Sequence, residues 1–402
     1  RNTGYRSKSM LVVPMRDHDD EVIGVLQLLN AQDRLTGQVM DFPAYQEDII
    51  TSLASQAAIG ITKMRLVRGL ENLFNSFIKA IADAIDEKSP YTAGHILRVA
   101  ELTELLAAAV NQAEGGPLAS VRFSDDELAE LRMAAWMHDV GKITTPEYIV
   151  DKSTKLETIF DRIELIRCRI ELLKKEAEIA HLRSLLGQEE EEADLPAAIG
   201  RELDEPLAFV EAVNAGRRTL GEEDHQRLEQ LARLQVEIKG RKTPLLNRDE
   251  VKNLTIQSGT LSPDERNIIE DHVTSTMKIL ESLPFPNKMR QVPLIAGMHH
   301  EKADGSGYPK GLAGEEIPLQ GKILAVADIF EALTAADRPY KRGKRLSKAV
   351  QILESMADSG QLDPGLCDLL VESGIVSQYA RRVLSERQRD DFVWRGRTYR
   401  VG

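Results

Sequence analysis

The chain has 402 residues, of which 42% are hydrophobic and 29% are charged. This composition excludes wholesale disorder and predicts a globular protein of two or three domains. The net charge of −12 excludes a global attraction to nucleic acid or to anionic lipid. An anionic substrate would therefore have to be held by a local positive site, such as bound metal.

The sequence contains no apolar run of the roughly 20 residues that cross a bilayer and no signal peptide at its start. Its only cysteines, Cys168 and Cys367, are too few for a disulfide framework and fit a reducing compartment. We therefore expect a cytoplasmic protein without a membrane span. Because the first residue is Arg1 and not methionine, we also expect this chain to be part of a longer one.

The N-terminal segment contains two short β-rich runs, residues 10–15 and 22–30, on either side of a turn-forming HDDE sequence. The stretch from Gly4 to Asn30 resembles the C-terminal half of a GAF sensory domain. We predict a small α/β fragment of such a domain at residues 1–42. The alternative is a leftover hairpin that packs on the helix that follows.

A long helix is predicted next, because residues 45–86 lack proline and apolar residues recur at steps of three or four. The repeating positions include Leu66, Leu70, Leu73 and Phe77. We interpret residues 43–86 as a connecting signalling helix that joins a sensor to an effector and pairs with its copy in a homodimer. A helix packed on its own domain would show the same periodicity.

The rest of the chain has helical patterns interrupted by loops, so the fold class we predict is mainly α, with a helical-bundle effector domain at residues 87–354. Two charge-rich helical stretches inside it, residues 156–186 and 207–238, predict an inserted helical hairpin at about residues 156–240. A C-terminal helical extension and tail occupies residues 355–402, and its last eleven residues have strand character.

Histidine carries the functional signal, because the chain has only eight and five of them lie in loops or helix ends beside acidic or glycine-rich sequence. These five are His95, His138, His272, His299 and His300. Each alone is more typical of a structural histidine, but their contexts (GHILRV, HDVGK, IIEDHV and HHEK) are more specific. Imidazole and carboxylate ligands suit iron, manganese or zinc, and a carboxylate such as Asp139 can bridge two ions.

Further motifs supply another carboxylate and groups that could bind an anionic substrate. Asp328 lies in an otherwise apolar stretch, where a metal partner would explain a buried carboxylate. Lys142 follows the His-Asp pair after a glycine and can neutralise a phosphate oxygen or a departing alkoxide. In the DGSGYPKG loop, Gly305 and Gly307 allow close backbone approach, while Tyr308 and Pro309 stiffen the turn.

Over about residues 84–354, the chain resembles the HD-GYP family, a branch of the HD metal-dependent phosphohydrolases. The resemblance rests on five motifs in this order: HD, HHEK, DGSGYP, ADIFEALT and RPYK. The resemblance implies a helical bundle around a site of two or three metal ions that hydrolyses cyclic di-GMP. It implies Asp139 as bridging carboxylate and catalytic residue with Lys142. The implied metal ligands are His95, His138, Asp139, His272, His299, His300 and Asp328. The implied substrate-side residues are Lys142, Gly307, Tyr308, Pro309, Arg338 and Lys341.

Two departures from the family pattern bear on these expectations. The connection between HDVGK and the His272 helix is usually short, whereas here the inserted segment intervenes. Some members also carry a glutamate four residues before the first histidine, where this chain has Tyr91, so we expect two ions, iron or manganese, and no third. The nearest alternative acid is Glu87. With two ions, we expect linear pGpG as the main product and slow conversion to GMP.

Two other functions fit the same sequence. One is a module that senses cyclic di-GMP, or recruits a protein partner through the GYP loop or the inserted hairpin, without turnover. The other is a phosphohydrolase that acts on a different nucleotide. The intact set of expected ligands favours the active enzyme, and nucleic acid polymers are not expected as partners.

Overall fold

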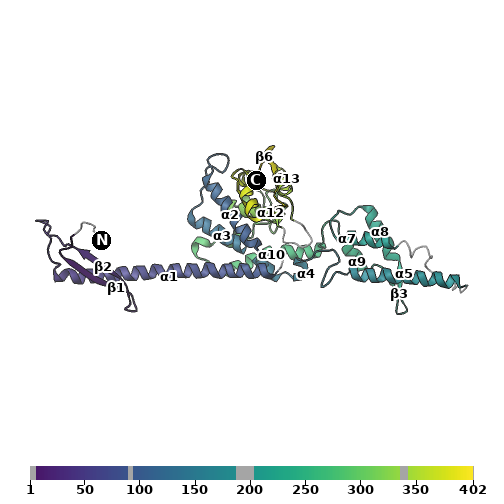
Figure 1. Cartoon of the computed structure of the whole chain (residues 1–402), viewed down its shortest axis with the longest axis horizontal. Helices are drawn as coiled ribbons and strands as arrows, with labels where there is room; N and C mark the ends of the chain where they lie inside the picture. The colour runs from purple at the N-terminus through teal and green to yellow at the C-terminus, as the bar shows by residue number, and fades with distance from the viewer. Residues whose placement is uncertain (1–5, 89–93, 187–202, 336–342, 402) are drawn as a thin grey trace. The chain divides into compact units, whose positions relative to one another are not determined.

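The computed structural model of the chain describes residues 6–88, 94–186, 203–335 and 343–401. Within these ranges the chain is mainly helical, as predicted, and none of the helices combines the length and the apolar character needed to span a membrane. Figure 1 shows the elements along the chain. The chain divides into two compact units, residues 1–80 and 81–402.

The first unit contains an antiparallel hairpin and most of one long helix. Strands β1 (Met10–Arg16) and β2 (Val22–Leu29) pair in register from Met10 opposite Leu29 onward, as the two β-rich runs predict. Helix α1 spans Ala44–Lys88, which confirms the uninterrupted helix expected from the absence of proline. The unit buries few apolar side chains among its described residues, namely Val13, Ala54, Ala58 and Ile78.

The second unit is built around a helical bundle with a buried aliphatic core. Helix α2 packs on α3 and α12, α10 packs on α11 and η1, and α13 packs on α12. The helices of the bundle and of the C-terminal extension are α2 (His95–Gln112), α3 (Asp125–Met137), η1 (Val140–Thr144), α4 (Glu147–Val150), α10 (Pro263–Glu281), η2 (Asn287–Met289), α11 (Val292–Ala296), η3 (Gly314–Glu316), α12 (Leu319–Thr334), α13 (Leu346–Asp358), α14 (Pro364–Glu372) and α15 (Ile375–Val383).

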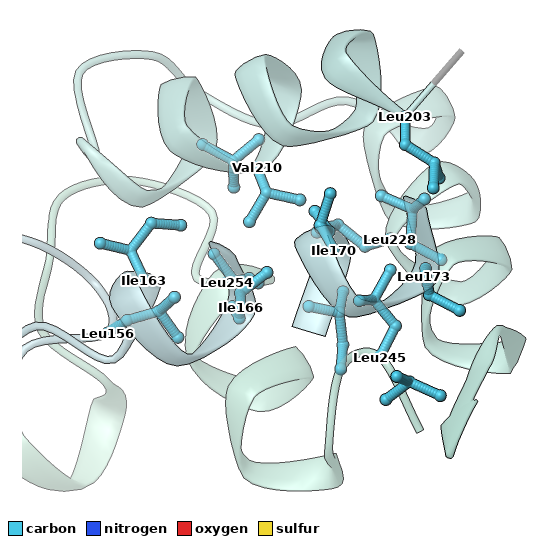
Figure 2. Close-up of a cluster of buried hydrophobic side chains, with 14 of the residues drawn as sticks. Leu156, Ile163, Ile166, Ile170, Leu173, Leu203, Val210, Leu228, Leu245 and Leu254 are labelled. Carbon is cyan, nitrogen blue, oxygen red and sulfur yellow. The ribbon is translucent and has the colours of Figure 1, made fainter. Parts of the chain in front are cut away.

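The segment between α4 and α10 forms a module with its own core, larger than the predicted two-helix hairpin. We call residues 154–259 the inserted module; it contains α5 (Ile163–Leu185), α7 (Asp204–Asn214), α8 (Glu222–Arg233), β3 (Gln235–Ile238), β4 (Arg241–Pro244) and α9 (Arg248–Leu254). Figure 2 shows its core, in which Ile166, Ile170 and Leu173 of α5 meet Val210 and Leu228.

The predicted helical stretches 156–186 and 207–238 are too long, because residues 156–162 precede α5 and residues 215–221 link α7 to α8. The prediction is also wrong for residues 235–238, which form strand β3. The physical reason is the turn that follows. Lys239 and Gly240 adopt left-handed conformations, with φ of 51° and 73°. Two consecutive positive φ values make the tight turn whose twist matches a β-hairpin, so the chain pairs back on itself as β4.

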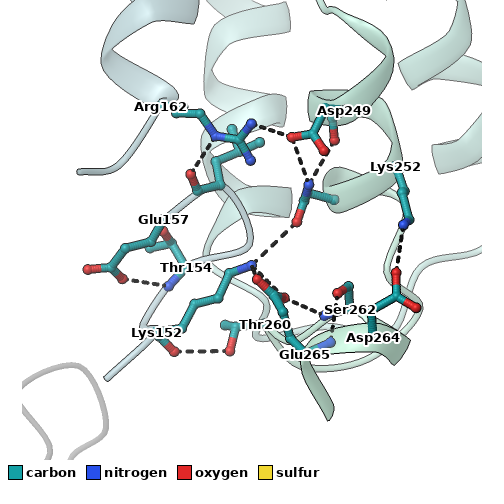
Figure 3. A network of polar contacts seen from close by, with 12 residues as sticks. Lys152, Thr154, Glu157, Arg162, Asp249, Lys252, Thr260, Ser262, Asp264 and Glu265 are labelled. Atoms are coloured by element: carbon teal, nitrogen blue, oxygen red, sulfur yellow. Dashed lines mark hydrogen bonds and ion pairs between the residues drawn. The ribbon is translucent and has the colours of Figure 1, made fainter. Parts of the chain in front are cut away.

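The two ends of the inserted module are tied together by polar contacts (Figure 3). The Lys152 ammonium donates to both carboxylate oxygens of Glu265 at 2.8 Å, and the Thr260 hydroxyl donates to the Lys152 carbonyl at 3.1 Å. Arg162 donates to Asp249 across the same region. The chain therefore leaves the bundle and returns to it at neighbouring points.

The C-terminal extension packs on the bundle and ends in the strand pair that its sequence predicts, β5 (Phe392–Trp394) and β6 (Arg397–Tyr399). Trp394 is fully buried, and its indole nitrogen donates to Asp368 at 2.9 Å. The Gln388 amide donates to the Thr334 carbonyl at the end of α12 at 2.8 Å. The extension thus stabilises the helix that carries Asp328.

Candidate metal centre

The structure brings all seven expected metal ligands together from five separate segments. Gly94, with φ of 77°, precedes His95, which is the first residue of α2 as expected. The His138–Asp139 pair follows α3 directly, and the tandem histidines follow α11. The whole set, His95, His138, Asp139, His272, His299, His300 and Asp328, is buried or nearly so.

Gly141 is what allows the His-Asp turn to approach helix α10. A Cβ added at Gly141 would lie 1.9 Å from the carbonyl oxygen of His272 and 2.5 Å from the backbone nitrogen of Thr276. The Gly141 amide donates to the Thr276 hydroxyl at 2.9 Å, and that hydroxyl donates to the His138 carbonyl at 3.0 Å. This packing places Asp139 and His272 within contact distance.

Three of the histidines are oriented by the carbonyl three residues before them. The Nδ1 atoms of His138 and His299 lie 2.7 Å from the carbonyl oxygens of Ala135 and Ala296, and His272 Nδ1 contacts the Ile269 carbonyl in the same way. A carbonyl only accepts, so each Nδ1 carries the proton and leaves a lone pair on Nε2. Fixing the tautomer in this manner is typical of metal-ligating histidine.

Asp139 lies among the Nε2 atoms. Its Oδ2 is 3.3 Å from His138 Nε2 and 3.6 Å from His95 Nε2, while its Oδ1 is 3.2 Å from His272 Nε2 and 3.8 Å from His299 Nε2. The two carboxylate oxygens therefore face different histidines. This is the geometry that a carboxylate bridging two ions requires.

The ligand atoms fall into two groups, each within 4.8 Å of its own members. His95, His138 and Asp139 form one group, and His272, His299 and His300 form the other. Asp328 Oδ1 lies 3.3 Å from His95 Nε2 and 3.9 Å from His138 Nε2, which associates it with the first group. The arrangement offers two adjacent positions for cations.

The residues fit bound metal, because several ligand atoms lack any other partner among the described residues. The Nε2 atoms of His138, His272 and His299 and Oδ1 of Asp139 are buried without a hydrogen bond. Leaving such atoms unsatisfied is costly, and ligation of a cation would satisfy all four. Imidazole with carboxylate favours a first-row transition metal over an all-oxygen magnesium site.

The protonation states at neutral pH also suit ligation. Burial lowers the pKa of His300 to about 4, and burial together with the neighbouring His300 and His138 lowers the pKa of His299 well below its ordinary value. Burial opposes ionisation of Asp139, yet Lys142 and His138 hold its pKa well below the usual range. Neutral imidazoles and an ionised carboxylate are the forms that bind metal.

His95 differs from the other histidines. Burial acts to lower its pKa, but Asp139, Asp328 and Glu331 outweigh burial and raise the pKa well above the ordinary value. In turn, although burial opposes it, His95 holds the pKa of Asp328 far below normal. A proton therefore stabilises this acidic end of the cluster, and a cation bound there would displace it.

The expected substrate-side residues are placed only in part. The Lys142 ammonium contacts Asp139 Oδ2 at 2.5 Å, and the Tyr308 ring lies over His300 with centroids 4.7 Å apart. Gly307 has no room for a side chain, but what it approaches is the chain itself, since a Cβ would meet the Lys302 nitrogen at 2.4 Å. Pro309 follows Tyr308 in the same loop.

Three residues of the sequence interpretation lie outside the described residues, namely Arg338, Lys341 and Tyr91. Glu87, the alternative acid for a third ion, lies in the last turn of α1 with its side chain exposed.

Sequence reasoning missed Glu331, a fully buried glutamate one helical turn after Asp328. Its Oε2 lies 2.5 Å from His95 Nδ1, and its Oε1 accepts from Arg98 at 2.6 Å. A second acid three residues after Asp328 in an apolar helix was the available signal. Glu301 was missed too; it is buried and accepts the amides of Lys310 and Leu312, which shapes the glycine-rich loop.

Comparison with known families matches the same region. Two sequence profiles described as HD domain match residues 92–215 and 213–366, and together they cover all seven cluster residues. The part of the chain that carries the cluster therefore matches HD domains. A profile described as GAF domain matches residues 1–61, which confirms the GAF-like fragment and extends beyond the predicted end at residue 42.

Curated relatives carry related names. One relative is "Cyclic di-GMP phosphodiesterase response regulator RpfG" of Xanthomonas campestris pv. campestris, to which the chain is 42% identical over 121 residues. This match covers 30% of the chain and 31% of the relative. The chain is 40% identical over 131 residues, 32% of its length and 34% of the relative's, to "Cyclic di-GMP phosphodiesterase" of Thermotoga maritima. The matched part spans about a third of each of these two relatives.

A longer match connects the chain with "3'3'-cGAMP-specific phosphodiesterase 3" of Vibrio cholerae, at 24% identity over 319 residues, 79% of this chain and 43% of that relative. The family resemblance stated from the motifs is thus confirmed by HD-domain profiles and by relatives named as cyclic dinucleotide phosphodiesterases.

Proposed function

We propose that this protein is a metal-dependent phosphodiesterase that hydrolyses cyclic di-GMP to linear pGpG. The observation that carries the proposal is the buried cluster in which the two oxygens of Asp139 face different histidines whose Nε2 atoms lack hydrogen bonds. The names of the relatives support cyclic di-GMP as the substrate.

We assign the seven cluster residues as ligands of two divalent ions, iron or manganese, with Asp139 as the bridge. Bound ions of this kind supply the Lewis acidity that hydrolysis of a phosphodiester at neutral pH requires. The choice between these metals rests on the imidazole and carboxylate donor set. The two ligand groups among the described residues support two cation positions, and this chain has Tyr91 where some family members carry an additional carboxylate.

The chain's own residues have distinct tasks in this proposal. The Lys142 ammonium, 2.5 Å from Asp139, is placed to stabilise or protonate the leaving 3′ oxygen. Tyr308, which covers His300, and the adjoining Gly307 and Pro309 contribute to the substrate pocket. Arg338 and Lys341 clamp the phosphates.

A direct assay tests the proposal. The protein is purified anaerobically, its metal content is measured, and it is incubated with cyclic di-GMP while the products are separated by chromatography. We expect pGpG to accumulate, GMP to form slowly, and Asp139→Ala to be inactive although helical. Turnover by Asp139→Ala at the wild-type rate would refute the mechanism.

A second candidate substrate is 3'3'-cGAMP, favoured by the relative that matches over the largest part of this chain. Both dinucleotides present the same phosphodiester to the cluster, so the ligands do not discriminate between them. Parallel assays at equal concentration give the ratio of the two kcat/KM values. A higher value for 3'3'-cGAMP would change the substrate and leave the metal chemistry in place.

We also propose regulation by the GAF-like fragment through α1, with α1 pairing in a homodimer. Leu66, Leu70, Leu73 and Phe77 are between 62% and 70% exposed, so this face of α1 has apolar surface to bury. Sedimentation of Leu70→Glu should show weaker self-association than the unaltered chain.

The two free cysteines support a reducing, cytoplasmic location.

A further inference from the structure

Helix α5 of the inserted module carries two apolar faces, and only one of them is buried among the residues that the structure describes. The inner face, which includes Ile166, Ile170 and Leu173, is buried in the module core (Figure 2). The outer face is exposed: Leu165, Leu172, Ile179, Leu182 and Leu186 keep between 43% and 74% of their surface, and Cys168 is exposed as well.

The outer face lies opposite the inner one. Leu172 follows Ile170 by two residues, as Cys168 follows Ile166, and two residues turn about 200° around an α-helix. The outer side chains therefore point away from the module core. They do not complete that core, so their apolar character needs another explanation.

The spacing of the outer face is that of a coiled coil. From Leu165 to Leu186 the positions advance by three and four residues in strict alternation, 165, 168, 172, 175, 179, 182 and 186. This average step of about 3.5 residues keeps a seam facing a partner helix along its whole length. Lys175 is the only charged residue among these seven positions, and its ammonium pairs with Glu178 beside the seam at 2.8 Å.

The helix is held rigidly for such a contact. The Arg169 guanidinium donates to Glu250 at 2.8 Å and to the Leu245 carbonyl at 2.6 Å, which ties α5 to the start of α9 and the segment before it. The seam is thus presented by a helix whose opposite side is already packed, and pairing would require little ordering of the chain.

The charges beside the seam favour a second copy of this chain in parallel orientation. One edge carries Glu164, Glu171 and Glu178, and an antiparallel pair would set this acidic edge against itself. In a parallel, in-register pair, Glu178 faces Arg183 of the other copy instead, twice by symmetry. Each of these three glutamates also has a basic partner in its own helix: Arg167 for Glu164 and Lys174 for Glu171, both at 2.6 Å, and Lys175 for Glu178 at 2.8 Å. Their charges are therefore partly compensated in either orientation, and the contact of Glu178 with Arg183 is what distinguishes the parallel pair.

We propose that α5 pairs with α5 of a second copy as a parallel, in-register two-stranded coiled coil, which makes the inserted module a dimerisation element. Symmetry would then bring the two Cys168 side chains face to face at the seam. Cys367, by contrast, is buried and serves as an internal control. This inference is independent of the proposed phosphodiesterase activity.

The test is disulfide crosslinking of the full chain at low concentration, with copper–phenanthroline as oxidant and non-reducing electrophoresis as readout. We expect a crosslinked dimer that disappears in Cys168→Ser and persists in Cys367→Ser. The double variant Leu172→Glu, Ile179→Glu should lower the crosslink yield at least tenfold. The matched control Ile159→Glu changes a 96% exposed residue that precedes the helix and should leave the yield unchanged.

Circular dichroism and metal content of each variant separate loss of pairing from loss of fold. Absence of the Cys168 crosslink in the unaltered chain would overturn the proposal, whether the face is vacant or covered by another part of the chain. So would a yield that the double variant does not change, since that indicates random collision. A disulfide that joins Cys168 of one copy to the cysteine of the Ile179→Cys variant in the other copy would indicate an antiparallel pair and would overturn the parallel register.

Discussion

Replacing Gly141 by alanine tests how the His-Asp turn is seated on α10. The added Cβ would lie 1.9 Å from the His272 carbonyl oxygen and 2.5 Å from the Thr276 nitrogen, both of which are backbone atoms that cannot rotate away. The turn and the helix must therefore separate. Overpacking of this kind costs about 1–3 kcal/mol, and loss of the Gly141–Thr276 hydrogen bond adds about 1 kcal/mol.

The expected loss is therefore about 3 kcal/mol in the free energy of unfolding, slightly more than a hundredfold in the folding equilibrium. Separation would also widen the 3.2 Å gap between Asp139 Oδ1 and His272 Nε2, so metal affinity should fall at least about tenfold. Denaturant unfolding measures the first effect, and titration of the metal-free protein with Mn²⁺ in a calorimeter measures the second.

Gly115→Ala is the matched control, because a Cβ at Gly115 would meet no atom within 4 Å. It should keep both stability and Mn²⁺ affinity. If Gly141→Ala unfolds at the same denaturant concentration and binds Mn²⁺ as tightly as the unaltered chain, the close packing of the turn on α10 does not support the cluster.

Glu331→Gln should weaken Mn²⁺ binding by about 10–100-fold in calorimetry, because it removes the carboxylate charge that orients His95; an unchanged Kd would exclude this role. Burial lowers the pKa of Lys155 to about 8, so the protonated form is the one that folding disfavours. The unaltered chain should therefore gain free energy of unfolding relative to Lys155→Met as the pH increases from about 8 toward the ordinary pKa of lysine. A loss over that interval would contradict the prediction. Replacing residues 154–259 by a short glycine-serine loop should leave metal content unchanged, because every proposed ligand lies outside them; a folded variant without metal would assign the module to the site.

The parts of the site that could be predicted from the sequence were those with local motifs. His138 and Asp139 are adjacent, and the tandem histidines precede a glycine-rich loop, so the residue type and context together indicated ligands. Glu331 escaped because its function depends on burial and on its distance from His95, which comes from a segment 236 residues away. Its position three residues after Asp328 indicated a second acid on the same helix face, but no periodicity along the chain reports its contact with His95.

The same distinction between local patterns and long-range contacts applies to the fold. Helix α1 and the strands at the C-terminus could be predicted because their patterns are continuous and local. The β3–β4 hairpin could not, since its strands are short and charge-rich, and the turn depends on the left-handed conformation of Lys239, a residue that rarely adopts it. The extent of the inserted module was underestimated for a related reason, because its core joins residues as distant as Leu156 and Leu254.

The most direct test of the metal centre is elemental analysis of protein purified anaerobically and without chelators, compared with Asp139→Ala prepared in parallel. We expect two transition-metal ions per chain in the unaltered protein and a substoichiometric amount in the variant, with helical content preserved. Less than one ion per chain in the unaltered protein, or an equal content in both, would contradict the assignment of this cluster as a metal centre bridged by Asp139.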